Sequence, residues 1–145
     1  MVVRNFVVIG AVILTMTAGL VSAHAGGSTV SIEQYGSGNG VGGGQHGYRN
    51  KLTVYQKGNR SSVISNQYGA RNRAVVGQQG NSHAANTYQN GRGNIVGVAQ
   101  FGSGHSVVTS QDGNGNAVGV IQAGRNNRAT TTQIGAGNVS VIVQD

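Results

Sequence analysis

Side chains suited to acid–base or redox chemistry are scarce in this chain. Glu33, Asp112 and Asp145 are the only acidic residues, and no two of them share a position in the 22-residue repeat described below. Catalysis by paired carboxylates needs two such groups facing one site. The chain has no Cys, so thiolate nucleophiles, thiolate metal ligands and disulfides are excluded. We therefore expect no enzyme activity, no catalytic residues and no cofactor.

His83 and His105 are titratable side chains with a meaningful spacing, because they occupy the same position in successive 22-residue repeats. In a stacked repeat they lie one above the other, which makes them a weak candidate for a metal site or a pH-sensitive site. The alternative, which we favour, is that each imidazole fills a hydrogen-bonding position in the repeat. We predict no metal site.

An eleven-residue repeat organises the sequence without interruption. Gln recurs at this spacing eleven times, and Gly stands two residues after each of the first ten. The Gln series is Gln34, Gln45, Gln56, Gln67, Gln78, Gln89, Gln100, Gln111, Gln122, Gln133 and Gln144. The Gly series is Gly36, Gly47, Gly58, Gly69, Gly80, Gly91, Gly102, Gly113, Gly124 and Gly135. Repeats of fixed period indicate a solenoid.

A longer period, of two such units, is superimposed on the first. Five residues after every second Gln stands Asn, in the series Asn50, Asn72, Asn94, Asn116 and Asn138. An apolar series has the same period: Ile32, Val54, Val76, Val98, Val120 and Ile142. The true repeat is therefore a 22-residue unit that consists of two similar halves.

Each half of the repeat reads as a β-strand followed by a turn. The Asn, Val or Ala, Val or Thr, and Gln positions alternate along the sequence, so in a strand they share one face. We predict strands of about six residues that end at the turn Gln-x-Gly-x-x. The opposite face, with Lys51, Thr53, Tyr55 and Arg73, has the composition of a solvated surface.

The predicted fold is all-β: a cross-β solenoid of about five 22-residue coils, each with two short strands that stack in parallel on the next coil. Coils about 4.8 Å apart place each residue over its equivalent in the next coil. Gln then lies over Gln and Asn over Asn, and stacked amides donate and accept along the column. The apolar series is the expected core.

The N-terminus has the pattern of a secretory signal. A short basic segment with Arg4 precedes an apolar run of about 15 residues and then small residues. We assign residues 1–25 to a signal peptide cleaved after Ala25, with Ala23 as the other cleavage site, residues 26–29 to a short segment and 30–145 to the solenoid. An N-terminal membrane anchor is the alternative. The mature chain is expected to contain no membrane span.

Both ends of the predicted solenoid lack polar caps. The sequences around Ile32 and Ile142 match the repeat, so we expect their strand edges to be open. Open edges pair readily with another chain. Since every coil resembles the next, the expected partner is a second copy in head-to-tail contact, which builds a filament.

The motif resembles the curlin repeat over about residues 30–145. The matching residues are Ser61, Gln67, Gly69, Asn72, Ala74 and Gln78, in the order and spacing of that repeat. The resemblance implies a curli subunit that crosses the periplasm, passes through the outer-membrane curli secretion machinery and joins other curlin subunits in an extracellular amyloid fibre for adhesion and biofilm matrix. Whether it is the major subunit or the minor nucleator stays open.

Basic residues form a further feature of the outer surface. Arg49 and Arg71 occupy equivalent positions in successive repeats, and so do Lys51 and Arg73. The net charge of +7 would attract anionic polysaccharide or extracellular DNA. The alternative is that like charges in register limit unwanted stacking during export.

Two other function classes remain. A monomeric secreted β-solenoid adhesin or binding module would use a flat outer face, although the Thr series at 87, 109 and 131 is expected to point inward. An enzyme on a solenoid is disfavoured by the shortage of acidic residues.

Overall fold

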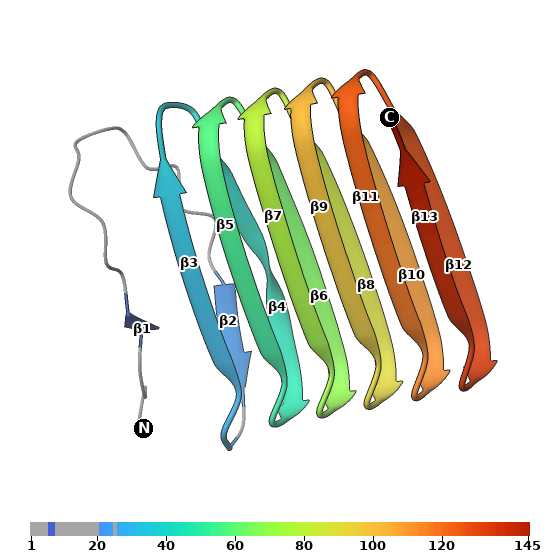
Figure 1. Ribbon diagram of the computed structural model, residues 1–145. Helices are drawn as coiled ribbons and strands as arrows, with labels where there is room; N and C mark the ends of the chain where they lie inside the picture. Colours follow the sequence, from blue (N-terminus) through green and yellow to red (C-terminus); the bar gives the residue numbers. More distant parts are fainter. Residues whose placement is uncertain (1–5, 8–20, 25) are drawn as a thin grey trace.

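A computed structural model describes residues 6–7, 21–24 and 26–145, and these form a stack of β-strands in two layers (Figure 1). The strands are β1 (Phe6–Val7), β2 (Val21–His24), β3 (Thr29–Tyr35), β4 (Gly40–Tyr48), β5 (Lys51–Asn59), β6 (Ser62–Ala70), β7 (Arg73–Asn81), β8 (Ala84–Arg92), β9 (Ile95–Ser103), β10 (Ser106–Asn114), β11 (Ala117–Arg125), β12 (Arg128–Ala136) and β13 (Val139–Gln144).

The chain alternates between two parallel sheets, so each strand pairs with the strand two further along. The odd sheet has the order β1-β3-β5-β7-β9-β11-β13, and the even sheet has the order β12-β10-β8-β6-β4-β2. From β2 to β13 the paired strands are offset by one 22-residue repeat, for example with Gln56 opposite Gln78 and Gln67 opposite Gln89. The predicted parallel β-solenoid with a 22-residue coil is confirmed.

The core is a narrow set of small apolar columns between the two sheets. Leu52, Ala74, Val96 and Val118 form one column of the odd sheet, and all four are buried. Val54, Val76, Val98 and Val120 form the next column and are also buried, while Ile32 and Ile142 at the two ends are half-buried and pack against the core. Such columns fill the interior without large side chains, because each contributes to two neighbouring coils.

The strands are longer than predicted, because the Gln-x-Gly segment belongs to the strand. β5, for example, has nine residues and continues through Gln56 and Gly58 to Asn59. Gly58 has a φ of 138°, and a Cβ there would overlap the carbonyl oxygen of Gly80 in the next coil. Glycine at this position therefore bends the strand while the ladder continues.

The reversal between sheets lies four residues after each Gln, at a left-handed residue. Arg49, Arg60 and Arg71 have φ values of 55°, 57° and 58° there, and Gly93 in the equivalent place has 69°. This position lies within the predicted turn Gln-x-Gly-x-x, but the sequence did not indicate its left-handed backbone, because Arg, Ser, Asn and Gly all occupy it.

The predicted signal peptide, residues 1–25, lies outside the described residues apart from β1 and β2. β2 pairs with β4, with Val21 opposite Gly43 and His24 opposite His46. In the part of the chain that the structure describes, no helix is long and apolar enough to cross a bilayer.

Three glycine substitutions should rank by their backbone and contact constraints. Gly58→Ala combines a positive φ with a backbone overlap and should lower the free energy of unfolding by more than about 2 kcal/mol. Gly93→Ala has a φ of 69° and free space around it, so the loss should be about 1 kcal/mol. Urea midpoints from circular dichroism of the soluble form measure the order.

Gly77→Ala is the matched control for these two variants. Gly77 lies in β7 without a positive φ, and the nearest atom to an added Cβ is the Val98 oxygen at 3.9 Å. Its urea midpoint should be unchanged or slightly higher. Equal midpoints for Gly58→Ala and Gly77→Ala would contradict the assigned role of the bend.

Candidate functional site

Two columns of Gln run along the interior as continuous hydrogen-bond ladders. In each step the Nε2 of one Gln donates to the Oε1 of the equivalent Gln in the next coil, over 2.6 to 3.0 Å. The ladder of the odd strands contains Gln34, Gln56, Gln78, Gln100, Gln122 and Gln144, and that of the even strands contains Gln45, Gln67, Gln89, Gln111 and Gln133. All amides therefore point in one direction along the stack.

The second amide proton of each Gln from Gln45 to Gln144 bonds to the opposite sheet and holds the two sheets together. Gln67 Nε2 donates to the Lys51 carbonyl at 3.1 Å, and Gln78 Nε2 donates to the Ser62 carbonyl at 3.1 Å. Both acceptors lie at the start of a strand in the opposite sheet. Gln from 45 to 122 in the series is at most 1% exposed, so these satisfied amides replace a conventional apolar core.

The Asn columns work differently from the prediction, because their side chains bond to backbone rather than to one another. Asn72 Nδ2 donates to the carbonyls of Tyr68 at 2.8 Å and Gly91 at 3.1 Å, while Asn72 Oδ1 accepts from the Asn94 backbone N–H at 3.0 Å. One side chain thus satisfies three backbone groups at the corner. The repeat predicted the column but could not distinguish amide–amide from amide–backbone bonding.

Other Asn members behave in the same way. Asn50, Asn94 and Asn116 are fully buried and make the equivalent bonds to a Gly carbonyl of the next coil. Asn138 lies in the last corner and is exposed. These residues close the corner between one sheet and the other.

His83 and His105 replace Asn in the alternate corners and reproduce its bonding. Their Nε2 atoms lie 3.2 Å from the Gln79 carbonyl and 2.9 Å from the Phe101 carbonyl, so each Nε2 carries a proton. Each Nδ1 accepts a backbone N–H of the next coil, from His105 at 3.4 Å and from Asn127 at 3.2 Å. Neither ring keeps a lone pair for a metal ion, so the geometry favours the hydrogen-bonding interpretation.

The same arrangement favours the neutral form of the His83 ring. The rings stack with centroids 5.1 Å apart and planes 4° from parallel, and each residue is 1% exposed. Burial lowers the pKa of His83 below its ordinary 6.5; carbonyl bonds to Gln79 and Gly102 oppose this, and the neighbouring His105 adds to it. Protonation would also place an Nδ1–H against a backbone N–H.

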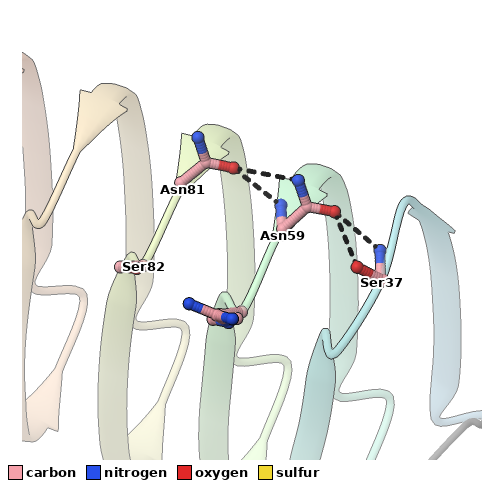
Figure 2. Close-up of a pocket in the computed structure, with 5 residues that line it drawn as sticks. Ser37, Asn59, Asn81 and Ser82 are labelled. Carbon is pink, nitrogen blue, oxygen red and sulfur yellow. Dashed lines mark hydrogen bonds between the residues drawn. The ribbon is translucent and has the colours of Figure 1, made fainter.

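An outer ladder along one corner was not anticipated from the sequence. Ser37 donates through its backbone N–H and its hydroxyl to Asn59 Oδ1, at 3.0 and 2.9 Å, and Asn59 donates through its backbone N–H and its side-chain amide to Asn81 Oδ1 at 3.2 Å (Figure 2). With Arg60 and Ser82 these residues line a recess of about 420 Å³. The available signal was the equivalent placing of Asn59 and Asn81 in successive repeats.

The basic residues singled out from the sequence occupy one corner and the strands beside it. Arg49 and Arg71 are exposed at the left-handed positions, and Lys51 lies opposite Arg73 on the outer surface of β5 and β7. The Arg49 guanidinium lies over the Tyr48 ring at 4.6 Å. The four cations therefore form a compact surface.

The ends of the stack differ from its interior. Among the described residues, β12 and β13 each have a strand on one side only. Gln45 Oε1 at the other end is buried and accepts no hydrogen bond from that part of the chain. Residues 6–7, 21–24 and 26–145 contain no group of three or more His, Cys, Asp or Glu that could hold a metal ion.

Comparison with known families supports the resemblance drawn from the motif. Residues 106–135 match the model of the curlin associated repeat, which covers β10, β11 and most of β12. The same register continues through the strands before this segment and into β13. No curated protein matches the chain. The match confirms the predicted resemblance to the curlin repeat over residues 106–135.

Gln78→Glu should disrupt the solenoid, because a buried carboxylate cannot donate to Gln100 or to the Ser62 carbonyl. The loss of two bonds and the burial of charge should cost more than about 2 kcal/mol at pH 7. The matched control is Gln79→Glu, one residue further on and exposed. Urea midpoints should fall for Gln78→Glu alone, and similar falls in both would contradict the role of the ladder.

Acid should weaken the solenoid through His83. Because its folded pKa is lowered, the unfolded chain binds the proton more readily, so the free energy of unfolding is highest above pH 6.5 and decreases as the pH falls below it. His83→Asn/His105→Asn should reduce the difference between urea midpoints at pH 7.5 and pH 5. His46→Asn, at an exposed histidine, should retain it. An unchanged pH effect in the double variant would refute this assignment.

Proposed function

Given the curlin repeat that it carries, we propose that the chain is a structural subunit of an extracellular, curli-like amyloid fibre. Copies join end to end, each adding its coils to those of the previous copy, and the fibre serves adhesion and biofilm matrix. Other curlin subunits are further partners. The function resides in the two ends of the stack rather than in a pocket.

The observation that carries this proposal is the direction of the Gln ladders. At one end Gln45 Oε1 lacks a donor among the described residues. At the other end Gln133 and Gln144 each donate one amide proton, to the carbonyls of Ala117 and Arg128, and neither ladder has a further Gln among the described residues to accept the second. One end therefore needs amide donors and the other supplies them, which favours head-to-tail joining over head-to-head joining.

The backbone supports the same polarity. Among the described residues β12 and β13 pair on one side only, so their other edges offer backbone N–H and C=O groups that a second copy in the same orientation can pair with as the next parallel strands. An association that does not close on itself produces a filament. The repeat also lets the incoming coil bury the same Gln and Val columns.

We further propose that removal of residues 1–25 activates the other end. Cleavage after Ala25 takes away β1 and β2, which pair with β3 and β4. The edges of β3 and β4 then become available to a second copy. Export through the periplasm and the outer-membrane curli secretion machinery precedes this assembly at the cell surface.

The basic surface formed by Arg49, Lys51, Arg71 and Arg73 suggests a second class of partner. All four residues are exposed and repeat with the coil, so a fibre would present them at regular intervals. Anionic polysaccharide and extracellular DNA carry matching charge. The same cations also keep soluble chains apart by repulsion.

Residues 26–145, diluted from denaturant, should assemble into fibres after a lag. We expect a rise in thioflavin fluorescence, unbranched fibres in electron micrographs and a fibre reflection at about 4.8 Å from the strand spacing. Sonicated fibres should remove the lag. A folded monomer that causes no rise in thioflavin fluorescence would overturn the proposal and favour a monomeric binding module.

Seeding of a second curlin subunit distinguishes a major fibre subunit from a minor nucleator. Trace amounts of a nucleator shorten the lag of its partner subunit, whereas a major subunit also polymerises alone into long fibres. The Gln78→Glu variant is the negative control, since its odd-strand ladder is interrupted at the centre.

A further inference from the structure

One outer face of the solenoid is apolar, although the sequence pattern predicted a solvated surface. The outward side chains of β9, β11 and β13 include Ile95, Phe101 and Ile121, which are 49%, 47% and 45% exposed. Val139, Val141 and Val143 on β13 are 74%, 70% and 66% exposed. We call these six residues the apolar face.

Charged residues border the apolar face but do not enter it. The other outward positions of β9, β11 and β13 within this face are filled by Ala and Gly, and Arg125 and Asp145 lie at its border. On the same odd sheet, Lys51 and Arg73 lie on β5 and β7. The odd sheet is therefore basic over its earlier strands and uncharged across the centre of its last three.

The even sheet of the same coils has a different character. β10 and β12 present Ser106, Asp112 and Arg128 on their outer surface, with Val108 and Ile134 as apolar exceptions. In these coils the outer surface of the even sheet is therefore mostly polar, whereas the outer surface of the odd sheet is apolar. The requirements of folding do not explain this difference, since both sheets have the same repeat and the same inward Gln.

Two glycines flatten the centre of the apolar face. Gly97 and Gly119 lie opposite each other in β9 and β11. Neither has a positive φ, and the nearest atom to an added Cβ is 4.0 Å away in both cases. The backbone therefore accepts larger residues here, so the fold itself does not require glycine. A shallow trough beside Ile95 and Ile121 allows close approach of another flat sheet.

We propose that the apolar face is the surface through which two filaments of this chain pack side by side, odd sheet against odd sheet. This inference rests on the proposed end-to-end filament. Ile95 and Ile121 of one filament enter the Gly97 and Gly119 trough of the other, and Phe101 closes one side. The occupant is a second copy of the chain, because a copy provides the same flat, uncharged surface.

The size of the apolar face explains why the partner must be a filament. Three strands about 4.8 Å apart and seven residues of about 3.3 Å rise cover roughly 300 Å². Stable interfaces bury about 800 Å² on each partner, so one apolar face is too small to hold two single chains together. In a filament the faces recur at a fixed interval, and their contributions add. Only another filament of the same chain repeats at that interval.

The charge of the protein leads to the same partner. The chain has a net charge of +7, and its described basic residues lie on corners, on β5 and β7 and at the ends of β8, β11 and β12, so most ways of bringing two copies together place like charges in contact. Contact through the apolar face avoids them. Added salt should therefore leave this packing intact or strengthen it.

Ile121→Lys tests the inference with a closely matched control. Ile121 lies on the apolar face at 45% exposure, and Ile64 lies on the outer surface of the even sheet at 48% exposure. Ile64→Lys adds the same charge to a strand of the same solenoid. Both variants should form filaments with thioflavin kinetics close to those of the parent chain.

Filament widths in electron micrographs and sedimentation at low speed give the readout. We expect the parent chain and Ile64→Lys to form bundles, and Ile121→Lys to remain as single filaments with at least a tenfold lower pelleted fraction. Gly119→Gln, which fills the trough without charge, should widen or loosen the bundles. Bundling of Ile121→Lys at the parental level would overturn the inference.

Mixing filaments that carry opposite charges at position 121 tests whether the apolar faces of two filaments are in contact. Filaments of Ile121→Lys mixed with filaments of Ile121→Glu should bundle together, while each alone stays single, because the mixture brings opposite charges into the same contact. Parent filaments that bind phosphatidylcholine vesicles through this face and never bundle would show a lipid partner and overturn the proposal. A parent chain that forms no filaments contradicts the end-to-end fibre itself, and this inference with it.

Discussion

The constraint on which the whole structure depends is the stacking of each residue on its equivalent one coil later. The repeat places Gln on Gln and Val on Val at the strand separation of about 4.8 Å. Amides can be buried only because this register gives each Nε2 from Gln34 to Gln122 an Oε1 to donate to. The glycine bend depends on the same register, since the strands approach each other too closely there for a Cβ. Folding and the proposed self-recognition therefore use one set of contacts.

The Gln ladders also make the stack cooperative. Successive hydrogen bonds that point the same way polarise one another, so a bond in the middle of a ladder is stronger than an isolated one. The first coil gains least from this effect and must also order its backbone alone. A coil added to an existing stack gains more. These two facts favour slow initiation and fast extension for any assembly that continues the ladder.

Much of this fold could be read from the sequence, because an uninterrupted repeat fixes which residues share a column. The spacing of Gln, Gly and Val in the sequence was enough to predict their columns. The bonding of Asn72 to three backbone groups could not be read in that way, since amide and backbone acceptors are equally compatible with an Asn column. The nine-residue strands were missed because Gly58 was taken as a turn residue, although its bend leaves the ladder intact. The outer face of β9, β11 and β13 was missed because the outward residues vary between coils and have no column of their own.

The register also restricts how the gene for such a chain can change in length. Insertion of one complete repeat adds one coil and leaves every column as it was. Insertion of half a repeat preserves the Gln and Gly series but moves all later strands to the other sheet, so that Val120 would continue the column of Thr109. An insertion whose length is not a multiple of half a repeat breaks both Gln ladders at once. Duplications and deletions are thus tolerated in units of one coil, and the number of coils can drift while the cross-section stays constant.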